Sequence, residues 1–159
     1  MDKFADESDR KLCIIVSKGT LDGAYPSLIM ANAALADGIE THLFFTFWGL
    51  DVITEKKMGH LPVTPVGNPS MGMPQAVAPM PGMQPVATRM MKKKIADLDV
   101  PDVEEFIEML SDMGAHLWAC RMTVDMLDLK EEDFHESVEA VISAGDFIEL
   151  SEGAQLLFT

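Results

Sequence analysis

The sequence predicts an α/β protein with a doubly wound, parallel, five-stranded sheet and helices on both faces. Short apolar segments rich in β-branched residues alternate with helical segments along the 159 residues. The first two apolar segments are joined by one helical segment with short connections, which favours a right-handed crossover and parallel pairing. We expect residues 1–159 to form a single domain, because this length suits one core.

The N-terminal segments set this pattern. Residues 12–16 read Leu-Cys-Ile-Ile-Val, a continuous apolar run typical of a strand buried on both faces. A helix is predicted from about 22 to 36, with Thr20 or Asp22 available as its N-cap. Residues 39–47 return to β-branched and aromatic side chains and predict the second strand.

Residues 58–91 differ in composition from the rest of the chain. They hold seven of the nine prolines and seven of the thirteen methionines, which predicts an insertion without regular structure until a helix begins near Ala87. We expect this insertion to pack on another subunit, so that residues 71–91 contribute buried area in a homo-oligomer. Disorder, or a soft-metal site made of Met71, Met73, Met80 and Met83, are the alternatives.

The C-terminal half continues the alternation of helices and strands. An apolar stripe at helical spacing follows Pro101 and ends before Gly114. Helices are predicted at 88–98, 101–113, 123–129 and 142–151, and strands at 115–119, 138–141 and 155–158.

The composition excludes several classes of function. With 26 acidic and 12 basic residues the net charge is −14, so nucleic acids and anionic membranes would be repelled. No apolar run approaches the length of a membrane span and the N-terminus does not resemble a signal peptide, which predicts a cytoplasmic protein. Two cysteines make neither a disulfide framework nor a four-ligand zinc site. We therefore expect two free thiols, no metal and no cofactor.

Candidate site residues follow the strands, because ligands collect at the carboxyl ends of parallel strands. Cys120 ends one strand just before a helix, where unpaired N–H groups and the helix dipole favour a thiolate. Arg121 would favour the anion if its guanidinium turned inward, whereas Asp125 would oppose it, so the direction of the shift stays open. A buried, inert cysteine is the alternative for Cys120. The supporting candidates are Ser17, Lys18, Gly19, Thr20, Asp22, Trp48, Gly49, Arg121 and Thr123.

Other reactive residues point to structure rather than chemistry. Cys13 lies in the middle of an apolar strand and is expected to be inert. His116 and Trp118 face the same side of their strand as Cys120, and we interpret them as a packing pair rather than a general base. The turn at 17–22 leads into a helix but lacks the glycines of nucleotide fingerprints.

Four motifs together resemble the DsrE/DsrF-like sulfur-carrier family, in its branch with a Met/Pro-rich insertion often labelled peroxiredoxin-family or DsrE-like. They are Ser17-Lys18-Gly19-Thr20 with Asp22, residues 44–50, Met80-Pro81-Gly82-Met83 before residues 90–94, and Ala119-Cys120-Arg121-Met122-Thr123-Val124-Asp125. The resemblance covers nearly the whole chain. It implies a flavodoxin-like sheet, homo- or hetero-oligomers, and a persulfide on Cys120. Thr123 stands where this branch commonly has serine, and it keeps the hydroxyl.

The resemblance implies a sulfurtransferase-like persulfide relay, with partner proteins that donate and accept sulfur through reactive thiols. It leaves open whether the protein is an enzyme, since a carrier can pass sulfur without turning over a small substrate. One alternative is a nucleotide- or flavin-binding module that uses the turn at 17–22 and Trp48. Another is a structural subunit of an oligomer, for which the thiol would be dispensable.

Overall fold

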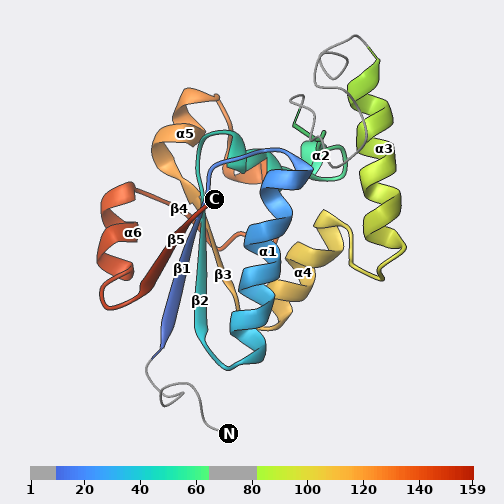
Figure 1. The fold of residues 1–159 in the computed structure, drawn as a ribbon. Helices are drawn as coiled ribbons and strands as arrows, with labels where there is room; N and C mark the ends of the chain where they lie inside the picture. Colours follow the sequence, from blue (N-terminus) through green and yellow to red (C-terminus); the bar gives the residue numbers. More distant parts are fainter. Residues whose placement is uncertain (1–9, 65–81) are drawn as a thin grey trace, which may run out of the picture.

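The apolar segments pair into one twisted parallel sheet (Figure 1). The computed structural model describes residues 10–64 and 82–159, and within them the sheet has five strands in the order β4-β3-β2-β1-β5. Every pair is parallel, as continuous rather than alternating apolar runs predict. The strands are β1 Lys11–Val16, β2 Glu40–Phe45, β3 His116–Cys120, β4 Ala140–Ile142 and β5 Gln155–Phe158.

Helices and short 3-10 helices connect the strands. The helices are α1 Leu21–Ala36, α2 Glu55–Met58, α3 Met83–Ala96, α4 Val103–Asp112, α5 Arg121–Met126 and α6 Ala144–Leu150, and the 3-10 helices are η2 Phe47–Val52 and η4 Glu131–Asp133. Side chains fix two of the starts: the Asp102 carboxylate accepts from the Glu105 N–H at 3.0 Å, and the Ser143 hydroxyl accepts from the Asp146 N–H at 3.1 Å.

The strand order explains which face each helix covers. Strands β1 to β4 follow one another across the sheet in one direction, and β5 then returns to the far side of β1. Right-handed crossovers therefore place α1 and α4 on one face and α6 on the other, as Figure 1 shows. The doubly wound α/β fold is confirmed. Its strand order nevertheless differs from the 2-1-3-4-5 order of flavodoxin itself.

The two faces carry unequal cores. On the α1 and α4 face the sheet contributes residues such as Ile14, Phe45 and Leu117 to one large cluster. On the α6 face a small cluster consists of Cys13, Phe44, Cys120 and Phe147, and the rings of Phe44 and Phe147 stack with centroids 4.5 Å apart. Cys120 thus lies on the face of the sheet that has the smaller cluster of buried residues.

Several predicted boundaries need correction. The second strand ends at Phe45 rather than Phe47, because Phe47 takes a left-handed conformation with φ 48° and residues 47–52 coil into η2. The helix expected near Ala87 begins at Met83, since Gly82 with φ 89° lets the chain enter it and Pro85 fits the first turn.

Smaller shifts occur near the C-terminus, and three of the described elements were not predicted. The segments predicted at 123–129, 138–141 and 142–151 are α5, β4 and α6, each displaced by one to three residues. The unpredicted elements are η2, α2 and η4. Residues 65–81, the interior of the predicted insertion, lie outside the described residues. Across the described ranges, no helix combines the length and the apolar character that a membrane crossing requires.

Candidate functional site

Cys120 is the last residue of β3, and α5 begins at the next residue. Its main chain pairs with Ile142 of β4, whereas the β2–β3 ladder stops one residue earlier at the pair Phe45 and Ala119. Continuing that register places Thr46 beside Cys120, on the same face of the sheet. The cysteine is only 3% exposed. Any reaction at its sulfur therefore takes place in a largely desolvated position.

Two threonine hydroxyls adjoin this cysteine. The Thr46 and Thr123 hydroxyl oxygens lie 3.2 Å apart, and the Phe47 N–H donates to the Thr123 oxygen at 3.1 Å. Thr123 is fully buried, and Thr46 is half-buried. These bonds join the end of β2 to the first turn of α5 around the sulfur.

The surroundings of the two cysteines shift their pKa values in opposite directions. Burial raises the pKa of the Cys120 thiol, but hydrogen bonds from the Thr46 side chain, the backbone and side chain of Thr123 and the Met122 backbone outweigh it, so the pKa is lowered. At Cys13, burial raises the pKa, and the Lys11 charge offsets this only in part. The structure thus makes a thiolate easier to form at Cys120 than at Cys13.

The loop after β2 is held in an uncommon conformation. Phe47 has φ 48°, in the left-handed region that bulky side chains avoid. Gly49 donates its N–H to the Ser17 and Thr46 carbonyls, at 3.1 and 2.9 Å. A Cβ at Gly49 would overlap the Val16 carbonyl oxygen and lie 2.7 Å from its carbon, so only glycine fits there. This close approach fixes Thr46 and Phe47 beside Cys120.

The turn at 17–22 makes its bonds within the protein. The Ser17 hydroxyl donates to the Thr159 carbonyl at 2.6 Å, and Gly19 lies so close to the Trp48 carbonyl that a Cβ would overlap its oxygen. Lys18 is exposed, and its side chain passes beside Gly23.

The rest of this turn binds the segment before residue 65. The Asp22 carboxylate accepts from the N–H and hydroxyl of Thr64 at 2.8 and 2.6 Å, and the Thr20 and Thr64 hydroxyl oxygens lie 3.3 Å apart. The Leu21 N–H donates to the Pro62 carbonyl. Hydrogen bonds within the protein therefore already use polar groups at the start of α1 that a bound phosphate would need.

Arg121 and the residues that share a face with Cys120 are engaged elsewhere. The Arg121 guanidinium donates to the Val141 carbonyl at 3.1 Å and lies 3.9 Å from Glu131, so it does not turn toward the sulfur. His116 binds Glu139 at 2.6 Å, and the Trp118 indole donates to the ring of His42 at 3.2 Å. His116 and Trp118 thus form part of a stacked, hydrogen-bonded row, in agreement with the packing interpretation.

Apolar side chains are exposed on η2 and α5, the two elements that adjoin the end of β3 at Cys120. Phe47 and Trp48 of η2 are 45% and 62% exposed, and Met122 of α5 is 59% exposed. We call these three residues the apolar rim. The α5 helix and η2 are in contact, so the rim residues come from adjoining elements. Exposed apolar side chains gathered at one edge of a protein are typical of a surface that contacts another macromolecule.

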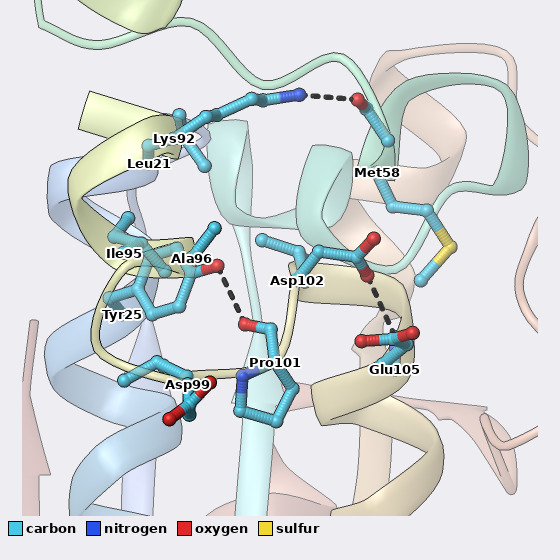
Figure 2. A pocket seen from close by; sticks show the side chains of 13 residues that line it. Leu21, Tyr25, Met58, Lys92, Ile95, Ala96, Asp99, Pro101, Asp102 and Glu105 are labelled. Atoms are coloured by element: carbon cyan, nitrogen blue, oxygen red, sulfur yellow. Dashed lines mark hydrogen bonds between the residues drawn. The ribbon is translucent and has the colours of Figure 1, made fainter. Parts of the chain in front are cut away.

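A cavity of about 540 Å³ lies elsewhere, among α1, α2, α3 and α4 (Figure 2). Tyr25 donates to the Pro101 carbonyl at 2.9 Å on one side, and Lys92 donates to the Gly59 carbonyl at 2.8 Å on another. None of the candidate site residues lines it. Among residues 10–64 and 82–159, no group of three or more His, Cys, Asp or Glu side chains is placed to hold a metal ion.

The sequence interpretation found Cys120 and Thr123 but missed Thr46. It extended the second strand to Phe47, so the residues considered at that strand end were Phe47, Trp48 and Gly49. A strand ending at Phe45 makes Thr46 the first residue beyond it. A hydroxyl-bearing residue at that position was the available signal.

Comparison with known proteins identifies relatives over most of the chain. The model of a family described as DsrE/DsrF/DrsH-like matches residues 8–158. The sulfur carrier protein DsrE2 of Allochromatium vinosum is 41% identical over 146 residues, which cover 87% of this chain and 91% of that protein. The uncharacterized protein YrkE of Bacillus subtilis is 30% identical over 162 residues, covering 96% and 98%.

Two solved structures share the fold at low sequence identity. MTH1491 of Methanobacterium thermoautotrophicum, a protein of unknown function, superposes with a TM-score of 0.61 at 12% identity. The ychN protein of E. coli superposes with a TM-score of 0.59 at 11% identity. Each comparison covers 95% of this chain and all of the other. They show that the architecture recurs in proteins of very different sequence.

Proposed function

The chain belongs to the DsrE/DsrF/DrsH-like family, and we propose that it is a sulfur carrier that holds a persulfide on Cys120 and passes it to a partner thiol. The observation that carries this proposal is the set of hydroxyl and N–H donors beside Cys120, which lowers the pKa of its thiol. A thiolate is the species that attacks a sulfur–sulfur bond. The name of the relative that is 41% identical supports the same role.

The chemistry consists of two thiol exchanges. In loading, the Cys120 thiolate attacks the outer sulfur of a donor persulfide; a new S–S bond forms on Cys120, and the donor leaves as a thiolate that takes up a proton. In unloading, an acceptor thiolate attacks the outer sulfur, and the electron pair of the broken bond returns to Cys120. One cysteine on the carrier suffices, because the donor and acceptor supply the other thiols, and no external oxidant is consumed.

The surroundings of Cys120 suit protein partners. The sulfur is nearly buried, so a reacting thiol must be brought to it across the apolar rim. Binding a partner surface there would exclude water from the exchange and orient the attacking thiol. We propose that donor and acceptor proteins dock on Phe47, Trp48 and Met122.

The alternatives have less support. A nucleotide or flavin would need the donors at the start of α1, yet Leu21 donates to Pro62 and the Asp22 carboxylate lies at that end of the helix. A carboxylate repels phosphate, and backbone N–H groups that are already hydrogen-bonded within the protein are not available to bind it. A purely structural subunit gives no reason for donors gathered around one thiol.

Mass spectrometry tests the proposal directly. The purified, reduced protein is incubated with inorganic polysulfide and weighed intact, alongside Cys120→Ser and Cys13→Ser variants whose folding is checked by circular dichroism. We expect the wild type and Cys13→Ser to gain mass in steps of one sulfur atom that a reductant removes. Cys120→Ser should gain none. Equal loading of Cys120→Ser and the wild type would contradict the proposal.

A further inference from the structure

The hydroxyl groups of Thr46 and Thr123 lie near Cys120, because Thr46 directly follows the β2 residue paired with Ala119 and Thr123 lies in the first turn of α5. The two oxygens lie 3.2 Å apart, so one hydroxyl donates to the other. The Phe47 N–H, 3.1 Å from the Thr123 oxygen, fills one acceptor position on that oxygen. Threonine offers one hydrogen and two acceptor positions, so the pair has two hydrogens and uses one between its members.

One hydroxyl hydrogen is left over in either arrangement. If Thr46 donates to Thr123, the Thr123 hydrogen is not used within the pair; if Thr123 donates to Thr46, the Thr46 hydrogen is not used. Thr123 is fully buried, and solvent gives its hydroxyl no alternative acceptor. The Phe47 N–H favours neither arrangement, because it only donates.

Resting on the sulfur-carrier function proposed above, we propose that Thr46 and Thr123 form a two-hydroxyl switch that positions one hydrogen on the charged sulfur of Cys120 before loading and after unloading. Thr46 and Thr123 are positioning residues in this scheme. They exchange no atom with the substrate and act by stabilising charge on the sulfur that does.

The switch matters most when the acceptor takes the sulfur. As the bond between Cys120 and the outer sulfur breaks, the electron pair collects on the Cys120 sulfur, which is 3% exposed and has little water to solvate it. A hydroxyl hydrogen already pointing there lowers the barrier without reorganisation. In the loaded state the Cys120 sulfur is neutral, and the hydrogens can turn toward each other or the outer sulfur.

The test removes the Thr46 hydroxyl while keeping the side-chain shape. Thr46→Val is made in a Cys13→Ser background, with Thr46→Ser to restore the hydroxyl. Thr41→Val is the matched control, because Thr41 lies at the other end of β2, is fully buried and spends its hydroxyl on the Ile39 carbonyl at 2.9 Å. The readout is the rate at which iodoacetamide alkylates Cys120 as a function of pH.

We expect Thr46→Val to move the midpoint of this profile upward by about one pH unit, since hydrogen bonds to a charged group have that order of effect. At neutral pH the alkylation rate and the rate of sulfur transfer to glutathione should fall by up to about tenfold. Thr46→Ser and Thr41→Val should both keep the wild-type midpoint.

Two other results distinguish a failure of the sulfur-carrier function from a failure of the two-hydroxyl switch. If the wild type gains no sulfur from polysulfide, the sulfur-carrier function fails, whatever the pH profile. If the wild type loads but Thr46→Val keeps its alkylation profile and its transfer rate, the switch is overturned while the carrier function stands. Should Thr46→Val fail to fold, Thr46→Ala provides the same comparison with a smaller side chain.

Discussion

Replacing Gly49 with alanine tests whether the close approach of two backbones builds the site. The added Cβ would overlap the Val16 carbonyl oxygen and lie 2.7 Å from its carbon and 3.2 Å from the Ser17 nitrogen. All three neighbours are backbone atoms, so no side chain can rotate away. The loop must shift instead, and the two hydrogen bonds of the Gly49 N–H are strained or lost.

The expected cost follows from these contacts. Overpacking costs about 1–3 kcal/mol, and a weakened hydrogen bond adds about 1 kcal/mol, so we expect a loss of about 3 kcal/mol. For a chain of this size that corresponds to a fall in Tm of roughly 6–12 °C. Because the same shift moves Thr46, the pKa of the Cys120 thiol should also rise.

Urea denaturation of Gly49→Ala, together with alkylation of Cys120 at several pH values, measures both effects. Gly59→Ala is the control, because a Cβ at Gly59 would meet nothing within 4 Å. Its free energy of unfolding should stay within about 0.5 kcal/mol of the wild-type value. If Gly49→Ala were as stable as the wild type, with an unchanged thiol, the close approach would not be what holds Thr46 in place.

Three further predictions concern the surface, the pH dependence of stability and assembly. Trp48→Ala should slow the removal of sulfur by reduced thioredoxin several-fold and leave loading by polysulfide unchanged. Leu98→Ala, which removes an even more exposed apolar side chain from another part of the surface, should change neither rate. Equal slowing by both variants would count against a docking role for the apolar rim. Burial raises the pKa of Asp22, but hydrogen bonds from the Thr64 side chain and backbone outweigh it, so the pKa is lowered. Its contribution to stability is therefore complete above the ordinary carboxyl range and is lost as the pH falls through the lowered value, so Asp22→Asn should flatten the decline of the unfolding free energy below about pH 4 in urea titrations, and an unaltered decline would contradict this. Light scattering after size exclusion should give a mass larger than one chain at micromolar concentration, and a monomer would refute the homo-oligomer.

The sequence was sufficient to predict the fold class and the position of Cys120 at the end of a strand, and physical reasons limit the other predictions. Continuous apolar runs such as residues 12–16 identify strands that are buried on both faces, and a residue at the end of such a run must lie at an edge of the sheet. The exact end of β2 depends on the left-handed conformation of Phe47 and on the close approach of Gly49 to the Val16 backbone, a contact between residues 33 positions apart. A contact between residues so far apart in the sequence cannot be predicted from the local residue pattern, so Thr46 was missed.

The direction of the Arg121 side chain could not be predicted from the sequence either. A guanidinium next to a thiol in sequence can point to either side of the backbone, and the choice depends on the Val141 carbonyl of the neighbouring strand. Gly19 and Gly49 were correctly selected as residues at strand ends. Their role in the structure is to allow two loops to touch, rather than to cradle a ligand.

Position along a strand, rather than burial, distinguishes the surroundings of the two cysteines. Cys13 and Cys120 belong to the same small cluster on the α6 face, and neither is more than 3% exposed. Cys13 pairs with His42 on one side and Leu156 on the other, so the ladder on both sides uses the nearby N–H groups. At Cys120 the ladder has already ended on the β2 side, and the next N–H groups, in the first turn of α5, have no partner within the helix. Those N–H groups, and the Thr46 and Thr123 hydroxyls near them, are hydrogen-bond donors that can stabilise a sulfur anion. The same residue type therefore has a raised thiol pKa in the middle of a strand and a lowered thiol pKa at its end.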